Sequence, residues 1–367
     1  MLSYRLIVLL IFFIHLGERK TSATPTSLAE LELSKIISKQ RLLFKKGSRW
    51  SETELIRQAQ EIVTQYESFL LENSNDTNAL ILFGKFLKKT GQHDDALALF
   101  LKADQTDSNI AVIKQELGNY LVESDQPMEA FPFFLMTTRL EPNEPIYHHN
   151  LGNFIFLFQE RLTNMNEAEK MGQLMHESFK EAARLAPSNF DYQLRYAQSF
   201  FDFNSSNKDE ALVAWEVLIK EFGERSEMEM DYLKLGKARV LIDLKRHEEA
   251  IPILNSIKSI SVLEQKNYLL RCAIDKKPKP NMKSNKQSSD AVPILYNPSL
   301  KSGYRKVVPF LSDPHLEKIK RITKQLFEDR MLRDFKRDVR KAKFLSTGEL
   351  SLEISVSDGK THNFSGP

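Results

Sequence analysis

The chain has 367 residues, of which 41% are hydrophobic and 28% charged, a composition typical of a globular protein. Its 13 glycines and 14 prolines are few, which argues against a β-rich fold. The net charge of +3 hides an asymmetry: residues 24–275 carry 29 Lys and Arg against 38 Asp and Glu, whereas residues 276–343 carry 19 against 7. The acidic body and the basic tail are therefore treated as separate units.

Residues 1–23 have the features of a secretory signal peptide. Arg5 precedes an apolar run over Leu6–Leu16, and the segment ends in small residues at Ala23. A helix of this run would span only about 16 Å of a hydrocarbon core that is roughly 30 Å thick. We therefore predict that the protein is exported, to the periplasm or as a secreted protein. The alternative is that the signal stays uncleaved and anchors the protein in the membrane.

Cys272 is the only cysteine, so the sequence offers no internal disulfide. Its apolar neighbours favour buried packing over a reactive thiol. Asn75, Asn204 and Asn363 match the N-glycosylation pattern, which has a meaning only in a host that glycosylates such sites.

A 34-residue period runs through the acidic body. It repeats Gly84, Ala96 and Phe100 as Gly118, Ala130 and Phe134. Small residues at the eighth and twentieth positions, with an aromatic residue at the twenty-fourth, resemble the tetratricopeptide repeat, a pair of antiparallel helices that stacks on its neighbours. The resemblance covers residues 51–274. It implies an all-α fold, an α-solenoid of stacked helical hairpins, and a scaffold that binds other proteins.

Two repeats, at 77–110 and 111–144, follow the pattern closely. In the first, helices are expected over Ala79–Thr90 and His93–Asp104. Ahead of them, Ser51 and Glu54 have the spacing of a capping box. The helix that they begin is interpreted as part of a degenerate repeat that caps the array, and residues 24–50 as a separate N-terminal segment.

The third repeat contains eleven extra residues between positions 156 and 175, and Met175 stands where the family has a small residue. Either its helices are lengthened, or a loop bulges out near Thr163–Asn166. We favour longer helices, because residues 166–169 resemble a helix start. A fourth and a fifth repeat follow, and a helix over Val262–Ile274 is expected to cover the last exposed face.

In this family, ligands bind on the concave face, which the first helix of each repeat lines. Amides at successive positions there suit an extended peptide, because each offers a donor and an acceptor. Asn119 and Asn153 match the family's Asn residue for residue, although such amides are also compatible with a plain solvated surface. The chaperone-binding subclass is not expected, because only Lys85 and Asn119 fall near its carboxylate clamp and Glu116 would repel a carboxylate. The resemblance implies these peptide-binding residues: Lys85, Gln115, Asn119, His149, Asn150, Asn153, Arg195, Gln198 and Arg239.

The sequence contains no motif for catalysis. It lacks a Gly-rich phosphate loop, a Gly-x-Ser-x-Gly elbow and a His-Glu-x-x-His metal pair. His148 and His149 are adjacent and would point about 100° apart on a helix, so they are not expected to share a metal. We predict that the protein is not an enzyme and uses no cofactor, metal or small-molecule substrate.

The basic tail begins with a Lys- and Pro-rich stretch, residues 275–290, which predicts a disordered linker. Residues 291–367 are expected to form a small α+β region. Asp313-Pro314 begins a helix that is expected to run to about Lys343, with an apolar stripe and a basic face. Alternation over residues 350–356, a turn and residues 361–364 predict a β-hairpin.

A basic amphipathic helix has three interpretations: it lies on an anionic membrane, binds an acidic partner or nucleic acid, or packs against its own tail. Nucleic acid is not expected of an exported protein without interleaved aromatic residues. Two hypotheses follow: a non-catalytic exported scaffold that binds a protein or an extended peptide on its concave face, or a membrane-surface accessory protein that docks on anionic lipid. The opposite charges also predict that the tail folds back on the array.

Overall fold

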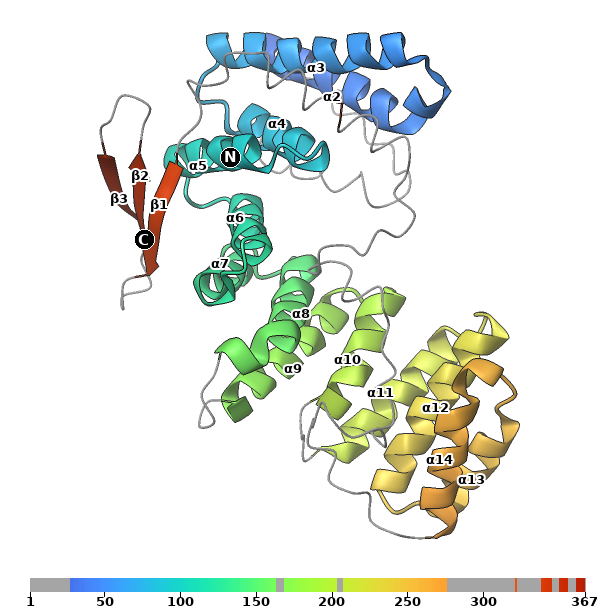
Figure 1. Cartoon of the computed structure of the whole chain (residues 1–367). Coiled ribbons are helices and arrows are strands. Elements are labelled where there is room, and N and C mark those ends of the chain that lie inside the picture. The colour runs from blue at the N-terminus through green and yellow to red at the C-terminus, as the bar shows by residue number, and fades with distance from the viewer. Residues whose placement is uncertain are drawn as a thin grey trace. The chain divides into compact units, whose positions relative to one another are not determined.

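The computed structural model describes residues 27–162, 168–202, 207–275, 321, 338–344, 350–355 and 361–366. The described residues form pairs of helices followed by a small sheet (Figure 1). The chain divides into two compact units, residues 1–133 with 307–367, and residues 134–306. Each unit is built from stacked helical hairpins, as in a solenoid of the tetratricopeptide-repeat type.

Unit 1 begins with a helical hairpin whose first helix lies in residues 24–50, the segment expected to be separate from the array. The first helix follows Ser27, whose hydroxyl accepts a hydrogen bond from the amide of Glu30 at 3.1 Å. It packs on the next helix, against the buried ring of Tyr66. The helices of this unit are α2 (Leu28–Lys46), α3 (Glu52–Glu72), α4 (Thr77–Lys89), α5 (His93–Thr106), α6 (Ala111–Glu123) and the first half of α7 (Pro127–Leu140), with a short 3-10 turn at Gly47–Arg49.

The predicted capping box at the start of α3 forms only in part. The Ser51 hydroxyl accepts the Glu54 amide at 3.2 Å, as expected. The Glu54 carboxylate does not reach back to Ser51 but pairs with Arg57 and Gln58 on the next turn. A complete box forms instead at the start of α12 (Glu227–Asp243), between Ser226 and Glu229.

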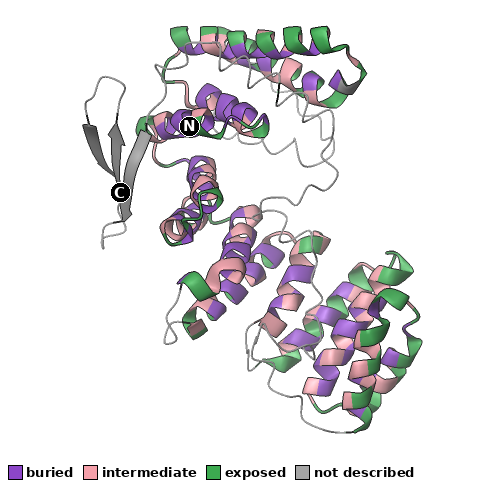
Figure 2. Ribbon diagram, in the orientation of Figure 1, coloured by how far each residue is buried: buried purple, intermediate pink, exposed green. Residues whose placement is uncertain are grey.

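The core of unit 1 runs through α2 to α6 and is rich in aromatic residues. Tyr66 stacks on Phe83 with ring centroids 4.8 Å apart. Buried residues, purple in Figure 2, lie on all sides of α4 and α5, where Ala79–Gly84 and Ala96–Leu101 are buried without a break. The small residue at the eighth position of a repeat has a specific role here: a Cβ atom added at Gly84 would lie 2.7 Å from the buried Phe100 ring. The period therefore reflects a glycine that accommodates an aromatic ring.

Unit 2 contains the longer third repeat. Its helices have 18 residues each, which confirms the prediction of lengthened helices, and residues 163–167 between them lie outside the described residues. Met175 is fully buried at the position where the family has a small residue. The helices are the second half of α7, α8 (Pro145–Leu162), α9 (Ala168–Leu185), α10 (Phe190–Asp202), α11 (Lys208–Glu221), α12 (Glu227–Asp243), α13 (His247–Ser256) and α14 (Leu263–Ile274), with a short 3-10 turn at Ile260–Val262.

The expected closing helix is present as α14. It buries Leu269 and Ala273 against the core of unit 2. Cys272 is half-buried and carries a free thiol, so the expectation of a buried cysteine holds only in part. No described helix is both long and apolar enough to cross a bilayer.

The tail contains a three-stranded antiparallel sheet in the order β1 (Asp338–Phe344), β2 (Leu350–Ser355) and β3 (Thr361–Gly366). The pairing of β2 with β3 confirms the predicted hairpin. The prediction of a helix to Lys343 is wrong at its end, because residues 338–344 pair with β2. A hairpin of two strands is marginal alone, and pairing a third strand overrides the helical period of this segment. Before the strand, Arg321 is the one tail residue described as helical.

Candidate functional site

The nine predicted groove residues all lie on the first helices of the repeats. The structure brings them together in two groups, one in each unit. In unit 1 the group consists of Lys85 on α4 with Gln115 and Asn119 on α6. In unit 2 it consists of His149, Asn150 and Asn153 on α8, Arg195 and Gln198 on α10, and Arg239 on α12.

In unit 1, two lysines share one carboxylate. The Glu116 carboxylate accepts a hydrogen bond from Lys88 Nζ at 2.9 Å and lies 3.8 Å from Lys85 Nζ. Burial opposes the ionised form of Glu116, but the charges of Lys88 and Lys85 outweigh it and hold the pKa of this carboxyl below its usual value. Burial lowers the pKa of Lys85, against the pull of Glu116. Lys85 is therefore not an unpaired cation.

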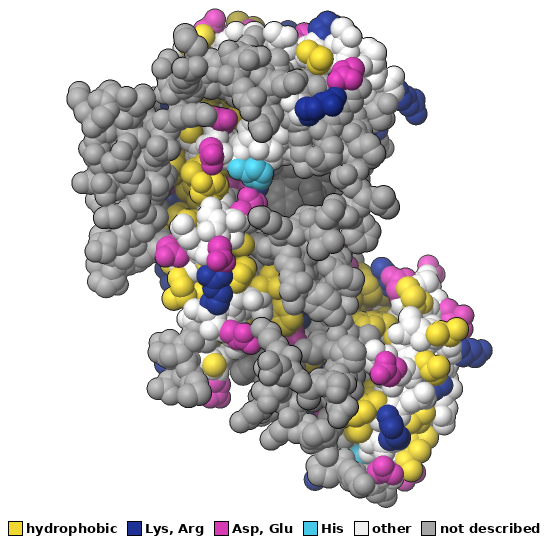
Figure 3. Space-filling view, in the orientation of Figure 1, with side chains coloured by type: hydrophobic (Ala, Val, Ile, Leu, Met, Phe, Trp, Pro, Cys, Tyr) yellow, Lys and Arg dark blue, Asp and Glu magenta, His cyan; other side chains and the backbone are white. Residues whose placement is uncertain are grey.

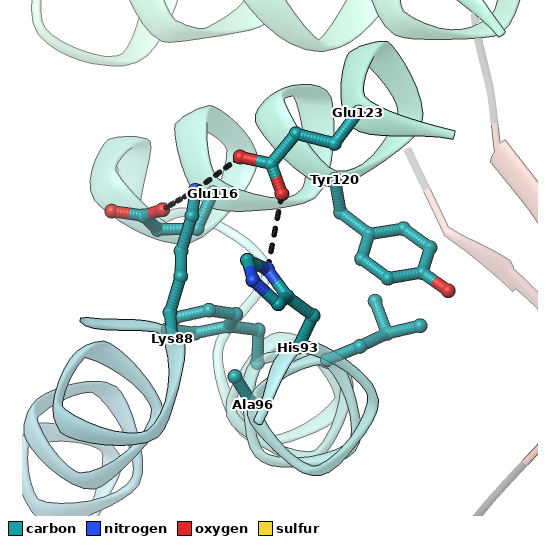
Figure 4. Close-up of a pocket in the computed structure, with 8 residues that line it drawn as sticks. Lys88, His93, Ala96, Glu116, Tyr120 and Glu123 are labelled. Atoms are coloured by element: carbon teal, nitrogen blue, oxygen red, sulfur yellow. Dashed lines mark hydrogen bonds and ion pairs between the residues drawn. The ribbon is translucent and has the colours of Figure 1, made fainter. Parts of the chain in front are cut away.

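A small pocket adjoins this ion pair, between α4, α5 and α6. Lys88, His93 and Tyr120 line it together with Glu116 and Glu123 (Figure 4). Lys88 Nζ lies 3.5 Å from the Glu123 carboxylate, and His93 Nδ1 lies 3.2 Å from the same carboxylate. Lys88 thus faces two carboxylates, and the imidazole of His93 lies beside one of them.

The amides of α6 are also engaged within the protein. Gln115 Nε2 donates to Asn119 Oδ1 at 3.1 Å. Asn119 in turn hydrogen-bonds to the Glu116 carboxylate. Gln115 is buried and Asn119 is half-buried. A ligand would meet Asn119 as the accessible end of this chain of hydrogen bonds.

In unit 2, Arg195 occupies the centre of the group. Its guanidinium lies between two rings, 4.3 Å from the centroid of Phe156 and 4.2 Å from that of Phe179. Nη1 is 2.6 Å from Asp202 Oδ2, and the two side chains are only 3% and 6% exposed. The Nε and Nη2 atoms of Arg195 are buried and have no hydrogen-bond partner among the described residues.

His149 and Asn153 lie one turn apart on α8, and the charge of Arg195 acts on His149. The His149 ring is 4.7 Å from that of Tyr192 and meets the edge of Phe179 at 5.8 Å. Burial, with the charge of Arg195 as a second cause, lowers the pKa of His149 to about 4, so the ring is neutral at pH 7. Within the described ranges, His149 Nδ1 and Asn153 Oδ1 are buried without a hydrogen-bond partner.

The group continues onto α12. Gln198 Nε2 donates to the Tyr232 hydroxyl at 2.5 Å, which joins α10 to α12. The guanidinium of Arg239 lies 3.9 Å from the centroid of Phe201, and burial lowers the pKa of Arg239. Asn150, the sixth predicted residue of this unit, is half-buried beside His149 on α8. The predicted residues therefore link successive first helices to one another.

Several residues of these groups were not predicted from the sequence. Asp202 follows Arg195 by seven residues, two turns along the same face of α10, and that spacing of opposite charges was available as a signal. Phe179 and Tyr232 come from other helices, so only the fold places them here. Across the described side chains, acidic and basic groups are interspersed on the visible surface (Figure 3). Among these residues no cluster of three His, Cys, Asp or Glu side chains could hold a metal ion.

Comparison with known proteins adds information on the fold. No family model and no curated protein matches the sequence. The structure is similar to YrrB, a tetratricopeptide-repeat protein described as having an unusual peptide-binding site, with 17% identity and a TM-score of 0.44 over 58% of this chain and 98% of YrrB. PilF of Pseudomonas aeruginosa is 14% identical, with a TM-score of 0.42 over 67% of this chain and 99% of PilF. MamA is 13% identical, with a TM-score of 0.38 over 55% of this chain and 98% of MamA. At these values the similarity concerns the fold alone.

Proposed function

We propose that this protein is an exported, non-catalytic scaffold that binds a protein or an extended peptide along the first helices of its array. Arrays of stacked helical hairpins present extended binding surfaces. The observation that carries the proposal is the group around Arg195 in unit 2. Four buried hydrogen-bonding atoms of Arg195, His149 and Asn153 have no partner in the part of the chain that the structure describes.

Such atoms are costly to maintain. An unsatisfied buried polar group costs about 1–3 kcal/mol, so a fold keeps few of them without a compensating role. Here they belong to side chains on two successive first helices, at the fifth, sixth and ninth positions of the repeats, and the charge of Arg195 acts on His149. Because these atoms are buried, a peptide laid across α8 and α10 would satisfy them with its own donors and acceptors once the side chains that cover them moved aside.

The binding proposal is tested by capturing partners of the exported protein and identifying them by mass spectrometry. Asn153→Ala should abolish capture, because Asn153 Oδ1 is unsatisfied in the described structure. Asn119→Ala should weaken capture less, because Gln115 and Glu116 already engage this amide. Asn255→Ala is the matched control, since Asn255 is exposed on the second helix α13.

Helical circular dichroism must be unchanged in all three variants. Capture of the same partners by the combined Asn119→Ala and Asn153→Ala variant at wild-type level would show that the first helices do not bind them.

Export rests on residues 1–23, which lie outside the described residues. The features that support it are the basic start, the apolar run and the small residues near Ala23. Cell fractionation with N-terminal sequencing of the purified protein tests it. A mature protein that begins near residue 24 agrees with a cleaved signal, and an intact N-terminus in the membrane fraction agrees with the anchor.

The membrane-surface hypothesis depends on the basic helix after Asp313, of which only Arg321 is described. It predicts that the full chain binds vesicles of anionic lipid and that salt weakens this binding. If anionic and neutral vesicles bound the protein equally, the membrane-surface hypothesis would be ruled out.

A further inference from the structure

The acidic array contains a long stretch without any acidic residue. Residues 33–51 include six basic residues and no Asp or Glu. They form most of α2 and the 3-10 turn that follows it. This contrasts with residues 24–275 as a whole, where 38 acidic residues outnumber 29 basic ones. Any acidic partner for these cations must therefore come from another element or from a ligand. The six basic residues are Lys35, Lys39, Arg41, Lys45, Lys46 and Arg49.

Some cations of this surface have an acidic partner within the protein and others do not. Lys39 forms an ion pair with Glu61 of the neighbouring helix α3. By contrast, Arg41, Lys45 and Lys89 are exposed, and they make no ion pair or hydrogen bond within the part of the chain that the structure describes. These three residues are referred to below as the basic cluster.

An aromatic ring brings the basic cluster together across two helices. Lys89 Nζ, at the end of α4, lies 4.0 Å from the centroid of the Phe44 ring in the last turn of α2. Phe44 adjoins Lys45 in the sequence and follows Arg41 by three residues, so all three share the end of α2. Phe44 also packs on Phe86 of α4, with ring centroids 5.9 Å apart. The rings thereby hold the two helix ends, and the cations on them, beside each other.

The stability of the helices does not account for this cluster. Like charges one turn apart destabilise a helix, and Arg41 and Lys45 have this spacing. Cations in the last turn of a helix interact favourably with the negative end of its dipole, which explains Lys45 and Lys89. It does not explain Arg41, which lies more than a turn before the end of α2. An anionic ligand would compensate all three charges.

The spacing of the cluster suits an extended acidic peptide. Cβ atoms one turn apart on a helix are separated by about 5–6 Å, which applies to Arg41 and Lys45. Side chains at alternate positions of an extended chain point to the same side and are about 7 Å apart. Carboxylates at alternate positions of a peptide therefore match these two cations. Leu42 stands between them in the sequence and is 40% exposed, so it can contact an apolar side chain of the same peptide.

A peptide fits this surface better than a membrane does. Helices that bind membranes present bulky apolar side chains that enter the lipid. Here Phe86 is buried and Phe44 packs half-buried against the core of unit 1, so neither ring projects from the surface. Leu42 alone would insert little apolar area into a bilayer, whereas it suffices as a contact for one side chain of a peptide.

We propose that the basic cluster formed by Arg41, Lys45 and Lys89 binds an extended segment of a partner protein that carries Glu or Asp at alternate positions. The inference rests on the proposed function, because it names a class of peptide that the array selects. Lys89 follows Lys85 by one turn on α4, so the cluster extends the unit 1 group of predicted binding residues onto α2.

The test uses two short fluorescent peptides, amidated at the C-terminus, in which alanine alternates with glutamate or with glutamine. Fluorescence anisotropy measures their binding to the full mature chain at low ionic strength. The glutamate peptide should bind at least about tenfold more tightly than its glutamine isostere, because the two differ in charge. This preference should shrink as salt is added, since exposed charges are screened.

The tail is also basic, so variants must assign the binding to the cluster. Exposed ion pairs are individually weak, and the three cations are therefore changed together. The combined variant Arg41→Gln, Lys45→Gln and Lys89→Gln should bind the glutamate peptide about tenfold more weakly than the wild type. Its tail is unchanged, so binding by the tail alone would leave the affinity at the wild-type level.

A matched control removes the same charge from unit 2. Lys245→Gln, Lys258→Gln and Arg271→Gln together change three exposed cations there, and the affinity for the glutamate peptide should change by less than about twofold. Circular dichroism must show that both triple variants are folded. If the cluster variant is unfolded, a glutamate peptide with a photoreactive group, cross-linked to the wild type, decides: its cross-links should map to α2 and α4.

Several results would overturn the inference. They are equal binding of the two peptides, wild-type affinity in the folded cluster variant, and cross-links confined to residues 276–367. A cluster variant that lost binding to vesicles of anionic lipid, but not to the glutamate peptide, would assign the cations to a membrane contact instead. A partner captured through Asn153 by a protein that does not bind the glutamate peptide would defeat the acidic-peptide site and leave the scaffold function standing.

Discussion

At three places in the described part of the array a glycine lies against an aromatic ring of another helix. Added Cβ atoms at Gly84 and Gly152 would lie 2.7 Å from the rings of Phe100 and Phe179. At Gly236 the added atom would lie 2.4 Å from the indole of Trp215. Real Cβ atoms do not approach so closely, so these glycines are fixed by packing. Two of the three contacts join the eighth and twenty-fourth positions of one repeat, and they explain why the sequence period was visible.

We therefore predict that Gly236→Ala destabilises unit 2. Overpacking a rigid core costs about 1–3 kcal/mol, whereas replacing a helical glycine by alanine gains only about 1 kcal/mol. Trp215 is 1% exposed and has no room to withdraw, so the packing cost should exceed the gain. Chemical denaturation measures the change in the free energy of unfolding. Gly236→Ala combined with Trp215→Leu should lose less stability than the two single changes added together, and simple additivity would contradict the contact.

His149 should make the stability of the protein depend on pH. Burial, followed by the charge of Arg195, lowers its folded-state pKa to about 4, against about 6.5 in an unfolded chain. Above pH 6.5 neither state binds the proton. As the pH falls from 6.5 towards 4, only the unfolded state binds it, so stability is lost by at most about 3 kcal/mol. His149→Phe keeps an aromatic ring and should lack this loss between pH 6.5 and 4.

Denaturation curves of the wild type and His149→Phe across this window measure the effect as a difference. The other titrating groups are present in both proteins, so their contributions to the pH dependence cancel in this difference. A difference that stays constant between pH 6.5 and 4 would show that His149 is not held neutral in the folded state.

The residue types at the binding positions could be predicted, but their environment could not. Asn153 and Arg195 were placed on first helices from their spacing to Gly152 and Ala197. Nothing local indicates that Arg195 is buried between Phe156 and Phe179, because Phe179 comes from a different helix. The pairing of Lys85 with Glu116 likewise crosses from one repeat to the next, and it depends on how the hairpins stack.

At the scale of elements, the helices end in a recurring turn. The amide of Gln92 donates to the carbonyl of Leu87 at 2.9 Å, and the amide of Gly91 to that of Lys88 at 3.1 Å, the two bonds of a Schellman motif. Gly91 adopts the left-handed φ of 90° that this motif requires. The same turn follows α6 and α12 with Asp125 and Lys245 at the left-handed position, so glycine is not a dependable marker of these ends.

A single carboxylate fixes the end of the array. Asp231 on α12 is 1% exposed, and its Oδ2 accepts the backbone amides of Lys258 and Ser259 at 2.9 Å each. Burial raises the pKa of Asp231, but hydrogen bonds from these amides outweigh it and lower the pKa to about 2. The carboxylate thereby holds the segment between α13 and α14.

We predict that Asp231→Ala loosens this segment. Loss of a charged acceptor for these two part-buried amides should cost about 1–3 kcal/mol locally. Hydrogen exchange at Lys258 and Ser259 should accelerate, while the amides of α4 and α5 in unit 1 keep wild-type rates. Glu227→Ala, an exposed change on the same helix, is the control. Unchanged exchange at both amides would show that Asp231 does not hold them.

Helices with a strongly periodic pattern of apolar residues were predicted correctly, whereas segments with an ambiguous pattern were not. The two helices predicted for residues 77–110 occur within two residues of their expected ends. Helix α2 went unrecognised because its leucines do not share one face: Leu33 and Leu43 are buried, whereas Leu28 is exposed. The segment that forms β1 has a helical pattern of apolar residues, yet its backbone pairs with β2. In this segment, pairing with another strand outweighs the helical pattern of its own residues.

At the scale of the whole molecule, the opposite charges of body and tail call for a test. One tail residue meets the array in the described structure: Arg321 Nη2 lies 2.7 Å from Glu52 at the start of α3, within unit 1. Both side chains are more than half exposed, so this pair alone is worth about 1 kcal/mol or less. Attraction between body and tail must therefore come from many weak contacts that act together.

We predict that the tail binds the array and that salt weakens the binding. A separately produced fragment of residues 291–367 should bind the array of residues 24–275 at low ionic strength, because net charges of opposite sign attract over a Debye length of about 10 Å at 0.1 M salt. The predicted linker would keep the two at an effective concentration on the order of millimolar within the full chain. Even a fragment that binds the separate array weakly would then occupy the array substantially when both belong to one chain. Deletion of residues 276–367 should therefore raise the affinity for a captured partner.

Glu52→Lys should reduce binding of the fragment more than Glu32→Lys on the neighbouring helix, since Glu52 makes the described contact. Fluorescence anisotropy of the labelled fragment measures both effects. Binding that is absent at low salt, or that is unaffected by added salt, would show that charge does not bring the tail back to the array.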